Sequence, residues 1–226
     1  MKTVRYIHSW ESGTTNMVFT TIPMIHIGSE EYYDIVSKII NEQNLILEEG
    51  IPIAIDSEIG TYNKIAHKVG LVTQGKYLRY DDDMFRINID IDVDNFKNAL
   101  SLIPKKDLFR IRLFKYILMF VPAEKIKEYI KIAFAYSEDA SIKLINPYNH
   151  YSYKHNKTPL DVLITTTRND SILNNLQKII DENKDRQYRY DIGITFGDDH
   201  MPFIYKKLQE NGFSWKLREK VVVFNI

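Results

Sequence analysis

The sequence contains no cysteine among its 226 residues. Without cysteine the chain has no disulfide framework and no thiolate metal site, so any metal ion would be held by histidine and carboxylate side chains. An excess of charge is also missing, because 30 Lys and Arg residues balance 30 Asp and Glu residues. This balance provides no general attraction to nucleic acid or to an anionic membrane surface. We therefore expect no nucleic-acid partner and no membrane partner.

Long apolar segments are missing as well. The longest apolar run, Leu113 to Val121, contains Lys115 and is much shorter than the roughly 20 residues that span a bilayer. The N-terminus lacks the apolar core of a secretory signal, because Arg5, His8 and Glu11 interrupt it. We therefore expect no export by the usual route and a cytoplasmic location, which the absence of cysteine fits.

The sequence does contain a repeated succession of short apolar runs and helical periods. With 44% hydrophobic residues, the chain is long enough for one sizeable core. The order of the runs favours an α/β fold, a central mixed β-sheet flanked by helices, in a single domain over residues 1–226. We expect strands within 1–12, 18–26, 44–47, 84–93, 161–167 and 190–196, helices at about 29–40, 57–68, 169–180 and 202–212, and a hairpin or edge pair over 215–226.

The middle of the chain has the pattern of a helical insertion over about residues 94–136. Phe96, Leu100 and Ile103 form one short helical face, and Pro104 and Pro122 separate it from two further helices. Helices inserted between two strand-rich halves often cover a binding site and limit which ligands enter it. We expect such a cap here.

Residues suited to chemistry occur where the predicted core strands end. A strand ends at His26, the next at Glu49, and two later strands are followed by Arg168 and His200. In open α/β sheets ligands bind outside the carboxyl ends of the strands, because helix N-termini and loop side chains converge there. We therefore expect these four residues to share one site.

Several segments together resemble a known superfamily. They are PMIHIGSEEYY, LILEEG, GLVTQ followed by Tyr80, the pair Arg168-Asn169, and GDDHMPFIYKKLQENGF. The chain resembles the TraB/Tiki-type superfamily from about residue 19 to residue 213. This superfamily also includes erythromycin-esterase-like and haem-uptake ChaN-like proteins. The resemblance implies a hydrolase, in some members a metal-dependent protease.

The resemblance also assigns roles to individual residues. The family has two Gly-x-x-His motifs. The second matches the segment ending at His200, and the first keeps His26 but lacks its glycine. The family's glutamate directly precedes a glycine, which favours Glu49 over Glu48. Further candidates for binding the substrate are Gln74, Tyr80, Asp90, Asp92 and Asn169.

Two mechanisms use the same four positions. In the first, His26, Glu49 and His200 hold a divalent metal ion such as Mn, Co or Zn, whose bound water is activated. In the second no cofactor is present: Glu49 orients or polarises a histidine that takes a proton from water. In both, Arg168 binds a substrate carboxylate or stabilises an oxyanion. Ligand distances decide between the two.

Other classes of function stay open from the sequence. We expect the partner of a hydrolase to be a small molecule or a peptide, and a homo-oligomer is possible on this pattern. The alternative is a non-catalytic ligand-binding or peptide-binding regulatory protein of the same fold, because the first histidine motif is degenerate. The aromatic and basic segment from Tyr148 to Lys157 could instead stack on nucleic acid, and we rank this last.

Overall fold

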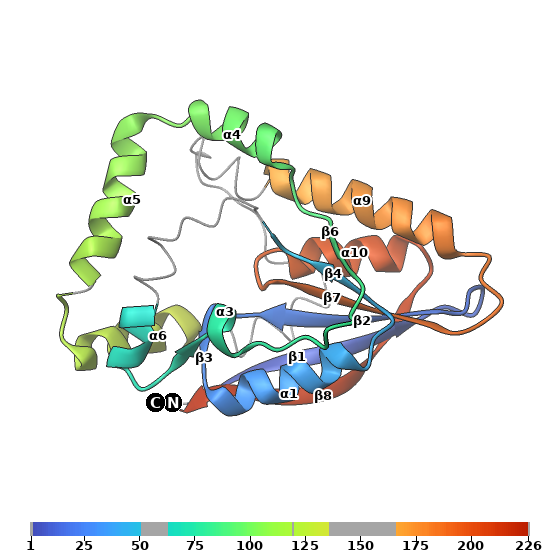
Figure 1. The fold of residues 1–226 in the computed structure, drawn as a ribbon, viewed down its shortest axis with the longest axis horizontal. Helices are drawn as coiled ribbons and strands as arrows, with labels where there is room; N and C mark the ends of the chain where they lie inside the picture. Colours follow the sequence, from blue (N-terminus) through green and yellow to red (C-terminus); the bar gives the residue numbers. More distant parts are fainter. Residues whose placement is uncertain (1, 51–62, 119, 136–165, 226) are drawn as a thin grey trace.

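The centre of the protein is a six-stranded β-sheet. The computed structural model describes residues 2–50, 63–118, 120–135 and 166–225 (Figure 1). The strand order is β6-β4-β7-β2-β1-β8. The strands are β1 (Lys2–Glu11), β2 (Met17–Met24), β4 (Leu45–Glu48), β6 (Arg86–Asn88), β7 (Tyr190–Gly197) and β8 (Ser214–Asn225).

The sheet is mixed, as expected from the sequence. The strands β6, β4, β7 and β2 are parallel to one another, whereas β1 is antiparallel to β2 and β8 is antiparallel to β1. Every residue of β2 is buried, which is typical of a parallel strand covered on both faces. The register pairs Met24 with Gly197 and Glu48 with Thr195, so the parallel strands end near one another at one edge.

Helices cover both faces of the sheet, which confirms the predicted α/β class. Helix α1 (Glu30–Asn41) lies on one face, and α9 (Arg168–Asn183) and α10 (Met201–Glu210) lie on the other (Figure 1). Ser29 begins α1 as its N-cap, because its hydroxyl accepts a hydrogen bond from the backbone N–H of Tyr32 at 3.1 Å. Two apolar cores result, one under α1 and one under α9 and α10.

Among the described residues, three helices lie between β6 and α9 in the sequence. They are α4 (Val93–Ser101), α5 (Lys105–Leu118) and α6 (Ala123–Ala135), and in Figure 1 they form an arc beside the sheet. Ile126 of α6 packs into the core under α1 together with Ile65 and Val69. A short second sheet of β3 (Ile27–Gly28) and β5 (Val72–Thr73), followed by helix α3 (Gln74–Tyr77), lies near the carboxyl end of β2. The predicted insertion is thus helical, and its role as a cap stays a prediction.

Two expectations about secondary structure are wrong. The alternating run 84–93 predicted one long strand, but β6 covers only Arg86–Asn88, and α4 already begins at Val93. Asp90, two residues after the end of β6, is buried and accepts a hydrogen bond from Arg168. The C-terminal segment is a single strand, β8, which pairs with β1 at the edge of the sheet with two irregularities in the register. Of the two expected arrangements the hairpin is therefore wrong, and an edge pair is found.

Some sequence-based expectations lie outside the described residues. These are the start of the helix predicted at 57–68, the segment 146–158 with its aromatic and basic residues, and most of the strand predicted at 161–167; Thr166 and Thr167 themselves are helical. Among the described helices, none has the length and apolar character needed to cross a membrane.

Candidate functional site

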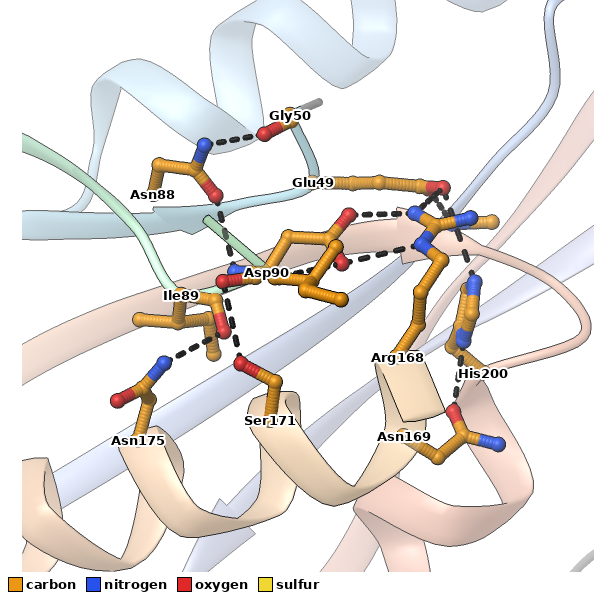
Figure 2. Close-up of polar contacts among 12 residues, drawn as sticks. Glu49, Gly50, Asn88, Ile89, Asp90, Arg168, Asn169, Ser171, Asn175 and His200 are labelled. Atoms are coloured by element: carbon orange, nitrogen blue, oxygen red, sulfur yellow. Dashed lines mark hydrogen bonds and ion pairs between the residues drawn. The ribbon is translucent and has the colours of Figure 1, made fainter. Parts of the chain in front are cut away.

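The carboxyl edge of the parallel strands gathers a cluster of charged and polar side chains. Glu49 directly follows β4, Asp90 lies two residues after β6, and His200 follows β7 by three residues. Arg168 and Asn169 approach from the first turn of α9 (Figure 2). The edge therefore brings together three of the four predicted catalytic residues and two of the predicted substrate-binding residues.

Glu49 is held by two partners. Its Oε2 accepts a hydrogen bond from the backbone N–H of Gly197 at 2.6 Å, and its Oε1 accepts one from Nη2 of Arg168 at 2.6 Å. A Cβ at position 197 would lie 3.1 Å from Oε2, closer than side chains normally approach. The glycine of the Gly-x-x-His segment thus leaves room for the carboxylate. Burial opposes ionisation of Glu49, but Arg168, His200 and the Gly197 N–H together hold its pKa below the usual value.

Arg168 is buried and bound to two carboxylates. Its Nε donates to Oδ1 of Asp90 at 3.0 Å, and its Nη2 donates to Oδ2 of Asp90 and to Glu49. The side chain of Asp90 is fully buried, and that of Arg168 is 9% exposed. Because a buried charge is costly unless it is paired, this bidentate geometry explains why Asp90 turns inward. In this arrangement Arg168 orients Glu49.

Helix α9 also fixes the backbone that carries Asp90. The Ser171 hydroxyl donates to the Asp90 carbonyl at 3.3 Å, and the Asn175 amide donates to the Ile89 carbonyl at 3.0 Å (Figure 2). Sequence reasoning missed both residues. Their only signal is their spacing of four residues on one face of the helix that begins at Arg168.

His200 is 4% exposed and is the N-cap residue of α10. Its Nδ1 lies 2.7 Å from Oδ1 of Asn169. An amide oxygen only accepts hydrogen bonds, so Nδ1 carries the proton and Nε2 is left with its lone pair. Nε2 lies 3.7 Å from Oε1 of Glu49. Burial lowers the pKa of His200, and Arg168 adds to this, whereas the charge of Glu49 opposes it. The imidazole is therefore neutral at neutral pH.

The other predicted residues have different surroundings. His26 is exposed in a bend after β2, and its carbonyl accepts a hydrogen bond from the backbone N–H of Gln74 at 3.0 Å. Tyr80 stacks under Arg86, 4.5 Å from ring centroid to guanidinium carbon, and burial raises its pKa to about 12. Asp92 is the N-cap of α4 and is exposed. Glu48, the neighbour of Glu49, forms an ion pair with Arg86 at 3.3 Å.

The predicted metal ligands do not form a ligand set in this structure. No group of three or more His, Asp or Glu side chains placed to hold a metal ion occurs within the described part of the chain. Both oxygens of Glu49 are already engaged by donors, one of them the guanidinium of Arg168. A guanidinium at hydrogen-bond distance competes with a cation for the same carboxylate, so this donor set does not fit a metal ion.

A separate cavity of about 340 Å³ lies at the opposite edge of the sheet, and it is electrically balanced. Lys216 pairs with Glu11, Arg218 with Glu42, and Arg189 with Asp191. The full lining is Ser9, Glu11, Glu42, Gln43, Arg189, Asp191, Lys216 and Arg218. Because its charges neutralise one another, this cavity gives no reason to place chemistry there.

The chemistry-bearing cluster is therefore the one at the carboxyl edge, built from Glu49, Asp90, Arg168, Asn169 and His200 (Figure 2). It combines a neutral imidazole, one ionised carboxylate beside it, and a buried arginine that fixes that carboxylate. No family model, no curated protein and no solved structure matches this chain.

Proposed function

We propose that the protein is a hydrolase of TraB/Tiki-like type that cleaves an ester or peptide bond in a small molecule or peptide, with His200 as general base. The observation that carries this proposal is the hydrogen bond between Nδ1 of His200 and Asn169. It leaves the lone pair of Nε2 available beside the carboxylate of Glu49. A buried neutral histidine with a fixed tautomer is what proton abstraction from water requires.

Each residue of the cluster has a separate role in the proposed reaction. Nε2 of His200 takes a proton from a water molecule, and the water oxygen attacks the carbonyl carbon of the substrate. Glu49 stabilises the imidazolium that forms. The imidazolium then gives its proton to the leaving oxygen or nitrogen as the ester C–O or peptide C–N bond breaks, which releases an alcohol or an amine and the carboxylic acid. Asn169 keeps the ring in one tautomer and orientation. Asp90 and Arg168 hold Glu49 in place.

The expected pH dependence of kcat/KM follows from the protonation state of the His200 imidazole. Because the pKa of His200 is lowered mainly by burial, the base stays neutral down to a pH below its ordinary value of 6.5. We expect kcat/KM to be constant near neutral pH and to fall only when the pH drops through that lowered pKa.

Hydrolysis of a panel of esters and peptides tests the proposal. The His200→Ala variant should lose at least about 100-fold in kcat/KM, in line with general acid–base catalysis. A matched control is His67→Ala, which removes an exposed histidine on a helix away from the cluster and should leave turnover unchanged. Equal turnover by the His200→Ala variant and the unmodified protein would overturn the assignment.

The metal-dependent version predicted from the sequence has its own test. Metal content of the purified protein is measured, and the same substrates are assayed with a chelator and with added Mn, Co or Zn. From the contacts of Glu49 described above, we expect that a chelator does not reduce turnover. Bound metal at one equivalent, together with turnover that depends on it, would favour the metal-dependent version with His26 as a ligand.

A second candidate is a non-catalytic ligand-binding or peptide-binding protein. The mutual pairing of Glu49, Asp90 and Arg168 favours it, because a rigid and internally satisfied network can also serve to shape a binding site. Ligand binding retained in the His200→Ala variant, without turnover by the unmodified protein, distinguishes this candidate from a hydrolase.

A further inference from the structure

The turn that carries His200 is held by contacts of three of its residues, Gly197, His200 and Asp198. The backbone N–H of His200 donates to the Gly197 carbonyl at 3.0 Å, which closes the turn between β7 and α10. Glu49 binds the backbone N–H of Gly197, and Asn169 binds the imidazole of His200. The third residue is Asp198, whose Oδ2 lies 2.8 Å from Nη2 of Arg5.

Arg5 reaches this turn from a strand that is not adjacent to β7. It lies on β1, which is separated from β7 by β2 in the strand order. β2 ends at Met24, which is paired with Gly197, so the Arg5 side chain extends past the end of β2 to reach Asp198. Only 2% of the Arg5 side chain is exposed. Its Nη1 donates to the Val4 carbonyl at 2.8 Å, which restrains the guanidinium.

Burying the guanidinium of Arg5 costs free energy. Removing a guanidinium from water costs several kcal/mol, and pairing with a carboxylate offsets that cost only if the geometry is well defined. Asp198 keeps a third of its side chain exposed, so it could turn toward solvent without Arg5. The ion pair therefore acts mainly on the turn: it holds Asp198, and the two residues after it, against the sheet edge.

We propose that Arg5 is a positioning residue for His200, which fixes the turn through Asp198 and so holds the imidazole against Asn169 and Glu49. Its effect on catalysis rests on the function proposed above, whereas its effect on the imidazole does not. Arg5 is too buried to contact substrate, so it acts only through the turn.

Nitrogen NMR of ¹⁵N-histidine-labelled protein near neutral pH measures the tautomer directly. The His200 resonances are assigned with the His200→Ala variant. In the unmodified protein we expect a single tautomer with Nδ1 protonated. In Arg5→Met we expect a mixture of tautomers and a fall in kcat of roughly 10- to 100-fold with little change in KM, because small displacements of a catalytic group are costly. Arg5→Lys should restore much of both.

Arg218→Met is the matched control, because it breaks an ion pair with Glu42 at the opposite edge of the same sheet. It should keep the single tautomer and the full kcat. If Arg5→Met does not fold, the double variant Arg5→Met/Asp198→Asn removes both charges and leaves no buried charge unpaired. It should show the same mixture of tautomers.

A single Nδ1-protonated tautomer in a folded variant without Arg5 overturns the proposal, whatever the effect on kcat. Failure of the proposed function gives a different result. In that case His200→Ala keeps the turnover of the unmodified protein, and the tautomer of the Arg5 variants still decides the positional claim.

Discussion

The buried histidine on β1 should make the protein sensitive to mild acid. His8 is 3% exposed and lies edge-on to Trp215 and to Tyr205, with ring centroids 5.0 and 5.7 Å away. Its Nδ1 has no hydrogen-bond partner among the described residues. Burial lowers its pKa from the ordinary 6.5 to about 4. The charged form is therefore disfavoured in the folded state.

The direction in which stability changes with pH follows from how many protons His8 binds in the folded and unfolded states. Above pH 6.5 the His8 imidazole is neutral in both the folded and the unfolded state. Its protonation therefore does not lower the free energy of unfolding there. Between pH 6.5 and about 4 the unfolded chain binds a proton that the folded protein does not, so stability falls with the pH. The difference between the pKa of His8 in the unfolded and the folded state corresponds to a loss of about 3 kcal/mol in unfolding free energy, since each pKa unit is worth about 1.4 kcal/mol.

Urea unfolding at pH 7, 5.5 and 4, followed by circular dichroism, measures this loss. The unmodified protein is compared with His8→Phe, which keeps a planar ring between Trp215 and Tyr205 but cannot bind a proton. Carboxylates also titrate in this range, but they do so in both proteins. The difference in unfolding free energy between the two proteins should therefore change by about 3 kcal/mol from pH 7 to pH 4.

His67→Phe is a control that makes the same substitution at an exposed position. A constant offset between the unmodified protein and His8→Phe at all three pH values would refute the reasoning. It would mean that the imidazole binds its proton equally well in the folded and unfolded states.

Three further substitutions test the site and its supports. Asp90→Asn leaves Arg168 with only the partly buried carboxylate of Glu49 and should cost about 3 kcal/mol in urea unfolding; a loss below 1 kcal/mol would contradict the account of this pair. Gly197→Ala places a methyl group against Oε2 of Glu49 and should lower kcat about tenfold with the fold intact, since it displaces the carboxylate from its N–H partner; unchanged kcat argues against that close approach. Ser29→Ala removes the N-cap of α1 and should cost about 1 kcal/mol, whereas Ser29→Asp should retain most of the stability.

Much of the arrangement could be predicted because it depends on local pattern. The continuous apolar run of β2 and the capped helix after it are visible in the sequence, and their order predicts parallel strands with a common carboxyl edge. That edge is where Glu49, Arg168 and His200 meet. The rule that ligands bind beyond the carboxyl ends of parallel strands points to these positions and equally to His26. The choice of Glu49 over Glu48 came from the resemblance.

The parts that could not be predicted depend on contacts between distant residues. The alternation from 84 to 93 favoured a long strand with Asp90 on its polar face, but an ion pair with a residue 78 positions away draws Asp90 inward. The residues next to a buried arginine in the sequence do not indicate which distant carboxylate will pair with it. For the same reason Arg5, which only interrupts an apolar run in the sequence, gave no sign of its pairing with Asp198.

The position of β7 has a consequence for how the protein is made. This strand lies between β2 and β4, although it follows them by more than 140 residues in the chain. On the ribosome β2 and β4 are therefore made well before the strand that lies between them, which is more than 140 residues further along the chain. Pairings between such distant segments form slowly, and unpaired strand edges are exposed in the meantime. Glu49 gains its partners at Gly197 and His200 only after this later segment has been made. The cluster at the carboxyl edge is therefore complete only when β7 has paired between β2 and β4.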